Sequence, residues 1–416
     1  MPRYLYILSF LLLTACSQQL DNQDHAFRVY DRDGVTIAET EGGPKYPGEV
    51  FTYERIMTLQ GDESDPESLL HLPEPAHSPT SFTVDESGFF YLADTNNHRI
   101  AVFRPDGTFE RSFGREGEGP GDLRSPRLIV EQNGKLRIQD SNRRTTLFAT
   151  DGSLVGIIQF NRGGNSIWEH GDYIVDIRSR SNPPDYTTLR SEALVKNTGG
   201  DTLAVISTPE VMIAAPVPTI VRLNNSRRIR PINLQYSASP LILHLRTSEF
   251  LLYAGSEPEL MFHDQAGTLI RRIVLDIPQM PVSSDEQKLV KDRLNELMRL
   301  AITDPGVFPI EMNPADIPFA DVKAPWQAVE VDDHGYIWLQ ESLPVWPFDP
   351  AGAETVVYRL LSPEGEYLGD THRPMAVNGQ VVRGYFLALV NDEELGTAVP
   401  VVYRISSAVR GFKYPN

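Results

Sequence analysis

The sequence predicts an all-β protein, a six-bladed β-propeller of four-stranded antiparallel blades, and three observations lead to this prediction. Short runs of alternating or apolar residues recur along the 416-residue chain. Turns that contain glycine separate these runs at regular intervals. Groups of four runs form a unit that repeats, and repeats of four strands are typical of propellers, in which each blade packs on its neighbours.

The first two blades have the clearest pattern. Residues 82–113 contain four runs, and their first and last turns are Glu86-Ser87-Gly88 and Arg104-Pro105-Asp106-Gly107. Residues 128–160 follow the same order, with turns at Asn133-Gly134 and Asp151-Gly152. These two segments predict blades one and two.

The remaining blades are less regular. Residues 167–206, 241–276 and 326–368 predict blades three, four and five, and residues 331–338 echo residues 84–91. Residues 375–405 supply only three strands of a sixth blade. Residues 51–56 match residues 109–113, and an acidic loop with glycine follows each. We therefore expect residues 51–59 to complete the last blade and close the ring, which removes exposed sheet edges.

One segment departs from the strand pattern. Ser283 and Glu286 have the spacing of a capping box, and four apolar residues follow at helical intervals. These residues are Val290, Leu294, Leu297 and Ala301. The pattern predicts a short helical insertion near 284–301, between blades four and five, whose apolar face packs on the propeller rather than on a partner.

The N-terminus predicts export and lipidation. Residues 5–13 form an apolar stretch after Arg3, too short to span a bilayer as a helix. The stretch ends in Leu13-Thr14-Ala15-Cys16, which resembles the bacterial lipobox, and Cys16 is the only cysteine. The resemblance implies that Cys16 carries the lipid. We therefore expect a lipoprotein signal peptide at 1–15, a tether and N-terminal segment at 16–50, and the propeller at 51–410.

These features also bound the location and the partners. Ser17, rather than an aspartate, follows the cysteine, which favours the outer membrane of a bacterial cell envelope. The protein would contact the membrane through its lipid anchor. The formal net charge of −18 repels phosphate backbones, so we expect no nucleic-acid partner.

The stretch Asp94-Thr95-Asn96-Asn97-His98-Arg99-Ile100 resembles the signature of NHL-repeat propellers. The downstream Phe113-Gly114 and three further glycines resemble the loop that links blades in that repeat. The resemblance is close over residues 82–126 and looser over 127–160. It implies the fold, but not the function, because NHL propellers include binding scaffolds, lyases and signalling modules.

Polar residues gather on one predicted face of the ring. In a four-stranded blade, the loop between the second and third strands lies on the same face as the loop that leads to the next blade. The ligand-binding candidates on this face are Asp94, Asn97, His98, Arg99, Asp140, Arg143 and Trp346. They could bind a glycan, another polar small molecule or a protein. The alternative is that the Asn-His-Arg cluster stabilises its own turn and the next blade, and for His98 we prefer this structural role.

The sequence favours non-catalytic binding at the cell envelope. None of the HxH, HExxH or GxSxG motifs is present, and the lone cysteine is assigned to lipidation. The alternative function is a metal-dependent lyase or hydrolase that holds a divalent metal, calcium or zinc, in the central channel. Asp94, Asp140, Glu330 or Asp332 could supply oxygen ligands for calcium. A third possibility is a structural part of an envelope complex.

Overall fold

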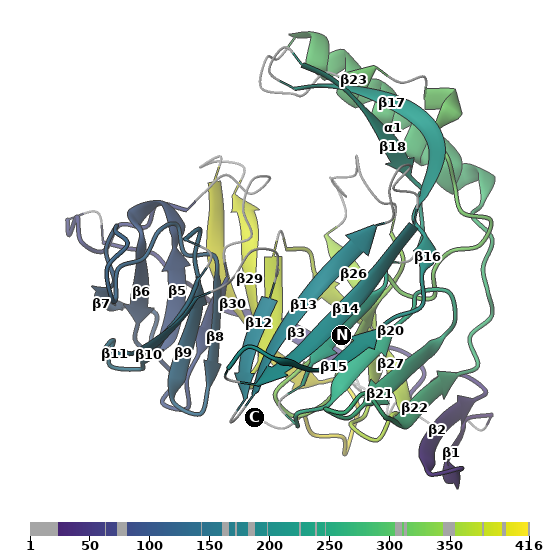
Figure 1. Cartoon of the computed structure of the whole chain (residues 1–416), viewed down its shortest axis with the longest axis horizontal. Helices are drawn as coiled ribbons and strands as arrows, with labels where there is room; N and C mark the ends of the chain where they lie inside the picture. The colour runs from purple at the N-terminus through teal and green to yellow at the C-terminus, as the bar shows by residue number, and fades with distance from the viewer. Residues whose placement is uncertain are drawn as a thin grey trace, which may run out of the picture.

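The computed structural model of the protein is a six-bladed β-propeller of four-stranded antiparallel sheets, as the sequence predicted (Figure 1). The structure describes residues 24–62, 64–72, 81–142, 144–159, 166–170, 173–181, 188–197, 199–223, 226–237, 239–245, 247–303, 310–311, 314–343, 354–376, 378–392 and 397–414.

The six blades occupy the predicted segments. Blade 1 contains β4 (Phe82–Val84), β5 (Phe90–Asp94), β6 (Arg99–Phe103) and β7 (Phe109–Phe113). Blade 2 contains β8 (Leu128–Gln132), β9 (Lys135–Gln139), β10 (Arg144–Ala149) and β11 (Leu154–Gln159). Blade 3 contains β12 (Ser166–His170), β13 (Tyr173–Ser181), β14 (Thr188–Asn197) and β15 (Thr202–Ser207), and β16 (Val211–Met212) also pairs with β14. Blade 4 contains β19 (Leu241–His244), β20 (Phe250–Tyr253), β21 (Glu259–His263) and β22 (Leu269–Leu275). Blade 5 contains β24 (Ala328–Val331), β25 (Ile337–Gln340), β26 (Thr355–Leu361) and β27 (Tyr367–Pro374). Blade 6 contains β28 (Asn378–Val382), β29 (Tyr385–Asp392), β30 (Thr397–Ser407) and β3 (Phe51–Thr58).

The sequence echo between blades 1 and 5 has a physical cause. In blade 1, Asp85 follows the first strand, and its carboxylate accepts hydrogen bonds from two backbone N–H groups of the turn and from the Tyr91 hydroxyl at 2.8 Å. In blade 5, Asp332 accepts from two turn N–H groups and from Trp338 Nε1 at 3.0 Å. An aspartate therefore fixes the turn and orients an aromatic side chain of the next strand.

Apolar clusters fill the spaces between blades. Within the described residues, such a cluster lies between blades 1 and 2, 3 and 4, 4 and 5, 5 and 6, and 6 and 1. Trp326 and Trp338 are fully buried in the clusters on either side of blade 5. No cluster of described residues lies between blades 2 and 3.

A segment near the N-terminus closes the ring, as predicted. β3 pairs antiparallel with β30, from Phe51 opposite Ser407 to Thr58 opposite Val401. Upstream, β1 (Ala26–Arg32) and β2 (Val35–Glu41) form a hairpin, and β2 pairs in parallel with β22 of blade 4. Between β2 and β3, the backbone N–H groups of residues 45, 46 and 50 donate to carbonyls of β27 in blade 5. Residues 26–58, here called the N-terminal belt, thus follow the outer edges of blades 4, 5 and 6.

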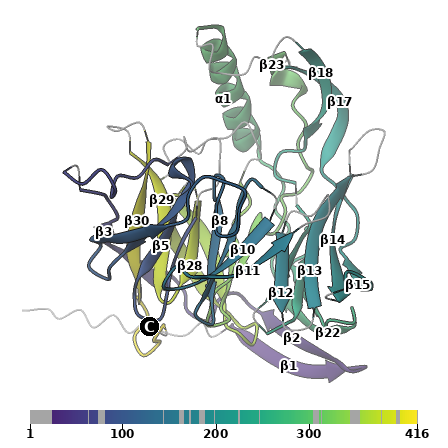
Figure 2. The same ribbon diagram turned by 60° about the vertical axis from the view of Figure 1, so that its left-hand side comes forward.

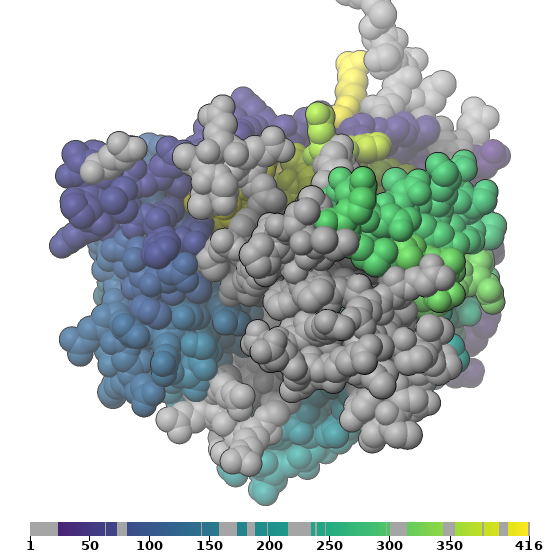
Figure 3. Space-filling view, turned by 90° about the horizontal axis from the view of Figure 1, so that it is seen from above, coloured from purple at the N-terminus to yellow at the C-terminus, as the bar shows by residue number. Residues whose placement is uncertain are grey.

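An arm projects from one face of the propeller (Figures 1 and 2). It contains β17 (Ala214–Leu223), β18 (Ser226–Asn233), α1 (Ser284–Thr303), β23 (Ile310–Glu311) and η2 (Pro314–Asp316). β18, β17 and β23 form a three-stranded sheet. Seen from above in Figure 3, the green region of the chain that includes α1 lies on the opposite side of the molecule from the blue region of blades 1 and 2.

The helix of the arm begins with the predicted capping box. Ser283 Oγ accepts from the Glu286 N–H at 3.3 Å, and the Glu286 carboxylate accepts from the Ser283 N–H at 2.8 Å. Val290 and Leu294 are fully buried, as their spacing predicted. They pack with Tyr236 and other residues of the segments that connect blades 3, 4 and 5, rather than on the strands of a blade.

Candidate functional site

The candidate residues of blade 1 form a buried clamp. Asp94 ends β5 and is fully buried. Its carboxylate accepts hydrogen bonds from Asn97 Nδ2 and Arg99 Nε, each at 2.8 Å, and from a backbone N–H of the segment 67–71 at 2.8 Å. Arg99 also donates to two carbonyls of that segment, at 2.7 and 2.8 Å. The three side chains therefore hold the loop that leads into blade 1, and we call them an Asp–Asn–Arg clamp.

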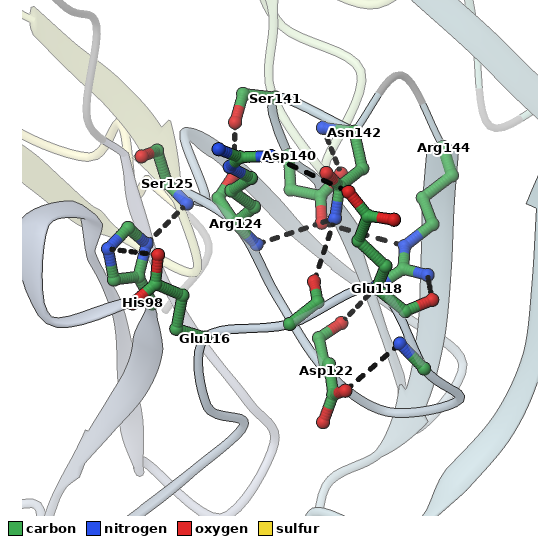
Figure 4. Close-up of polar contacts among 12 residues, drawn as sticks. His98, Glu116, Glu118, Asp122, Arg124, Ser125, Asp140, Ser141, Asn142 and Arg144 are labelled. Carbon is green, nitrogen blue, oxygen red and sulfur yellow. Dashed lines mark hydrogen bonds and ion pairs between the residues drawn. The ribbon is translucent and has the colours of Figure 1, made fainter.

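His98 lies in the loop between β5 and β6 and joins this loop to the connection between blades 1 and 2 (Figure 4). Its backbone has a φ of 57°, in the left-handed region that non-glycine residues rarely occupy. Nδ1 accepts the Ser125 N–H at 2.9 Å, and Nε2 lies 3.8 Å from the Glu116 carboxylate. These contacts are of the kind expected for a residue that stabilises a turn.

Blade 2 contains a second Asp–Asn–Arg clamp (Figure 4). Asp140 accepts the N–H groups of Arg124 at 3.1 Å and Asn142 at 3.0 Å, and Arg144 Nε lies 3.6 Å from its carboxylate. Arg144 also donates to two carbonyls of the loop that leads into blade 2, and Asn142 donates to a third at 3.0 Å. Burial raises the pKa of Asp140 despite these hydrogen bonds. We had not singled out Arg144, although its spacing from Asp140 is only one residue shorter than that of Arg99 from Asp94.

Four of the seven ligand-binding candidates on the predicted face are therefore engaged within the protein. Asp94, Asn97, Arg99 and Asp140 direct their hydrogen bonds to the protein's own loops. His98 remains 24% exposed at its side chain. Arg143 and Trp346 lie outside the described residues.

A larger site lies along the centre of the propeller. A cavity of about 950 Å³ is lined by the first strands of blades 1, 2, 4, 5 and 6 and by the turns that follow several of them. Its volume is at the upper end of the range for small-molecule pockets, about 300–1,000 Å³. Glu330 and Asp332 line this cavity, whereas Asp94 and Asp140 do not.

The cavity wall contains an ion pair within blade 5 that is also hydrogen-bonded to blade 6. Glu330 pairs with Arg373 at 2.7 Å and also accepts the Val381 N–H of blade 6 at 2.5 Å. The Arg373 guanidinium lies 3.6 Å from the centroid of the Tyr358 ring. Stacked and paired in this way, Arg373 is held in one position, so this part of the wall is rigid.

Arg383 connects four blades beside the cavity, where its partners Asp333 and Glu131 line the wall. It lies in the turn between β28 and β29 with a φ of 50°. Its backbone N–H donates to Asp333 of blade 5 at 2.9 Å, and its guanidinium donates to the Val84 carbonyl of blade 1 and pairs with Glu131 of blade 2 at 2.9 Å. Glu131 is only 1% exposed, so the ion pair places a positive charge beside a buried carboxylate.

The carboxylates considered as calcium ligands do not converge. In the described part of the chain, no three His, Cys, Asp or Glu side chains lie close enough together to hold a metal ion. Asp332 accepts hydrogen bonds from the turn N–H groups, from Trp338 and, at 2.6 Å, from the Tyr414 hydroxyl. Burial raises the pKa of Asp332 despite these bonds.

Among the described residues, no helix has the length and apolar character needed to cross a bilayer.

Comparison with known proteins adds one sequence match and several distant structures. Residues 77–103 match the NHL repeat. No curated protein matches the sequence. A DUF4221 member from Bacteroides vulgatus ATCC 8482 is 11% identical, with coverage of 86% of this chain and 99% of that one and a TM-score of 0.45. A presumed exported protein of Bacteroides fragilis NCTC 9343 is 10% identical, with coverage of 86% and 96% and a TM-score of 0.44. The virginiamycin B lyase of Staphylococcus aureus is 8% identical, with coverage of 85% and 99% and a TM-score of 0.37.

The topology of the chain and the match of residues 77–103 to the NHL repeat show a six-bladed β-propeller with an NHL repeat in its first blade.

Proposed function

We propose that the protein is a non-catalytic binding module of the bacterial cell envelope, anchored by a lipid on Cys16, and that it binds a polar ligand in the central cavity. The observation that carries this proposal is the cavity itself, with its volume of about 950 Å³ and the charged and polar side chains that stand among the apolar residues of its wall. Its size suits a ligand such as an oligosaccharide or a short peptide.

The cavity wall supports binding better than the predicted loop face does. Glu330 and Arg373 form an ion pair within the wall, and Glu131 of the wall pairs with Arg383 beside it, before any ligand arrives. A wall fixed in this way loses little conformational freedom on binding. Gln132 and His334 add polar groups that are not fully buried. The Asp–Asn–Arg clamps, in contrast, are occupied by the loops that they stabilise.

A cavity-filling substitution tests the site. Ala328 lies on β24 in the cavity wall, so Ala328→Trp should fill part of the space. Thr202→Trp, at an exposed position of β15, is the control. A thermal-shift screen with disaccharides, amino acids and dipeptides should identify a ligand of the natural protein. Its binding should be lost in Ala328→Trp and kept in Thr202→Trp. A ligand that binds both variants equally would place the site elsewhere, and a protein partner captured by both would do the same.

The membrane anchor has its own test. Leu13-Thr14-Ala15-Cys16 behind an apolar stretch supports lipidation, and a multiply acylated cysteine anchors stably, whereas one chain binds only marginally. Cys16→Ser should release the protein from the membrane fraction or leave the precursor uncleaved. Unchanged fractionation and unchanged mass in this variant would contradict the anchor.

A further inference from the structure

Blade 3 has two faces of different chemistry. Tyr173 and Val175 of β13, with Ala193 and Val195 of β14, form the face that packs on blade 4 in an apolar cluster. The side chains that alternate with these point to the other face, which is turned toward blade 2 (Figure 2). As described above, no apolar cluster of described residues joins blades 2 and 3.

Six charged side chains occupy this second face. The antiparallel register places Arg178 opposite Glu192 and Arg180 opposite Arg190. Residues in such pairs lie on the same side of a sheet. The six side chains are Asp176, Arg178 and Arg180 of β13 and Arg190, Glu192 and Lys196 of β14. We call this surface the charged face of blade 3.

Each acid on the charged face holds two cations. Asp176 pairs with Arg178 and, at 3.1 Å, with Lys196. Glu192 pairs with Arg180 and, at 2.8 Å, with Arg190. Two acids and four bases leave a surplus of two positive charges among these six residues, although the whole chain has a net charge of −18.

Two of the four cations of this face are accessible, whereas the acids are not. The side chains of Arg180 and Arg190 are 50% and 41% exposed, whereas that of Glu192 is 9% exposed. Val205 lies on the same face, because it is opposite Leu194, and it is 56% exposed. Blade 2 therefore leaves the outer part of this face open to solvent.

The arrangement is poorly suited to a purely structural role. Like charges directly opposite each other on neighbouring strands are destabilising, and Arg180 and Arg190 are such a pair. Arg190 Nε is buried and has no hydrogen-bond partner. Two guanidinium groups side by side are well suited to phosphate and carboxylate oxygens, because their N–H groups form bidentate hydrogen bonds.

We propose that the charged face of blade 3 binds an anionic ligand, with a phosphate or carboxylate group held between Arg180 and Arg190. Glu192 positions these two arginines, and Asp176 positions Arg178 and Lys196. Arg178 lies two residues along the strand from Arg180, about 7 Å away, and suits a second anionic group. The site is separate from the central cavity, because none of these six residues lines it.

Calorimetric titration of the natural protein at low ionic strength, with citrate and with tripolyphosphate, tests the proposal. Both probes should bind, and the double variant Arg180→Ala/Arg190→Ala should bind at least about tenfold more weakly, with both probes weakened by added salt. Arg28→Ala is a matched control, because Arg28 is also an exposed strand arginine that pairs with two glutamates, Glu39 and Glu41. If the natural protein bound neither probe, or if the double variant and the control lost equal affinity, the proposed site would be wrong.

A second variant separates binding from folding. Glu192→Gln removes the acid that neutralises both arginines, so it should tighten citrate binding even though it removes two ion pairs from the fold. A lower unfolding midpoint together with tighter binding is the expected result. Unchanged or weaker binding in folded Glu192→Gln protein would contradict the assignment. Ala328→Trp should leave citrate binding intact, so failure of the cavity proposal and failure of this one are distinguishable.

Discussion

The two halves of the propeller end differently at their outer edges. In blades 4 and 5 the N-terminal belt pairs along the outermost strands β22 and β27, and in blade 6 the belt supplies the outermost strand itself. In blades 1, 2 and 3 the strands β7, β11 and β15 end the sheets, and no described strand lies outside them. The same four-stranded unit is therefore enclosed on one side of the ring and open on the other.

The difference coincides with other properties of the two halves. Several large apolar side chains are exposed, and four of them lie on the open edges of blades 2 and 3. These four are Leu154, Val155, Leu203 and Val205. The interface between blades 2 and 3, where the described residues form no apolar cluster, also lies in the open half. Uncovered strand edges are sites where another chain can pair. We interpret the belted half as the part that holds the ring together and the open half as the part with surface available for binding.

Among the experiments that test the difference between the two halves, truncation of the belt should change stability most. Deleting residues 17–60 removes the whole belt with its buried Phe51, and also the buried Leu59 that follows it. Deleting residues 17–45 removes only the hairpin and leaves β3 in blade 6. We expect the longer deletion to abolish cooperative thermal unfolding, and the shorter one to lower the unfolding midpoint while keeping a single transition. Equal stability of the two proteins in differential scanning calorimetry would contradict the role of β3.

Hydrogen exchange should resolve the two halves directly. Backbone amides at the edge of a sheet exchange faster when no strand covers them. We expect β7, β11 and β15 to exchange faster than β22 and β27 when peptides are followed by mass spectrometry. In the protein that lacks residues 17–45, the backbone amides of β22 should exchange as fast as those of β15. Equal exchange of all six blades would mean that the belt protects nothing.

Within the open half, loss of a buried clamp should lower stability more than loss of the part-buried His98 contact. Asp94→Ala leaves the Arg99 guanidinium without its acid partner in a largely buried site, which costs about 3–5 kcal/mol in unfolding free energy. His98→Ala removes one hydrogen bond to the Ser125 N–H and should cost about 1–3 kcal/mol. Urea denaturation measures both. If His98→Ala left stability unchanged but abolished binding of a ligand, the loop from Asp94 to Arg99 would be a binding site.

The smallest expected effect concerns pH in blade 3. Burial favours the protonated form of Asp176, but hydrogen bonds from Arg178 and Lys196 outweigh it and lower the pKa of this carboxyl. A lowered pKa means that the ionised group stabilises the fold above the unfolded pKa, about 3.9, and that this stabilisation is lost as the pH falls through the folded value. The difference in unfolding midpoint between the natural protein and Asp176→Asn should therefore be constant near neutral pH and shrink below about pH 4. A difference independent of pH would contradict the assignment.

The parts of the fold that depend on local sequence could be predicted. Turns with glycine, the aspartates that fix them and the capping box at Ser283 are all encoded within a few residues. The closing strand was also predictable, because residues 51–56 resemble a strand of blade 1 and blade 6 lacked one. The clamp residues of blade 1 match a repeat signature, whereas Arg144 of the blade 2 clamp has no such match. The role of both clamps in holding the preceding loop follows only from the three-dimensional contacts.

Other features depend on contacts between distant residues, which no local pattern specifies. The parallel pairing of β2 with β22 joins residues more than two hundred positions apart, and the hairpin of β17 and β18 falls where we had assigned no element. Arg383 lies in an ordinary-looking turn, and only the fold brings it to Glu131. The charged face of blade 3 does have a sequence signal, alternate arginines at 178 and 180. Which charges oppose one another, however, depends on the register of β13 and β14.

The belt also sets the order in which the protein can be completed. Residues 26–58 leave the ribosome early, but their partners lie in β22, β27 and β30, and Phe51 pairs with Ser407, close to the end of the chain. Contacts between such distant residues form slowly, because a long loop must close first. Until β30 has been made, blade 6 therefore consists of β28 and β29 alone, and β3 has no partner strand in it. A chain that stops before β30 therefore loses the closing contact of the ring, as does a chain that lacks β3, although these two strands are far apart in the sequence.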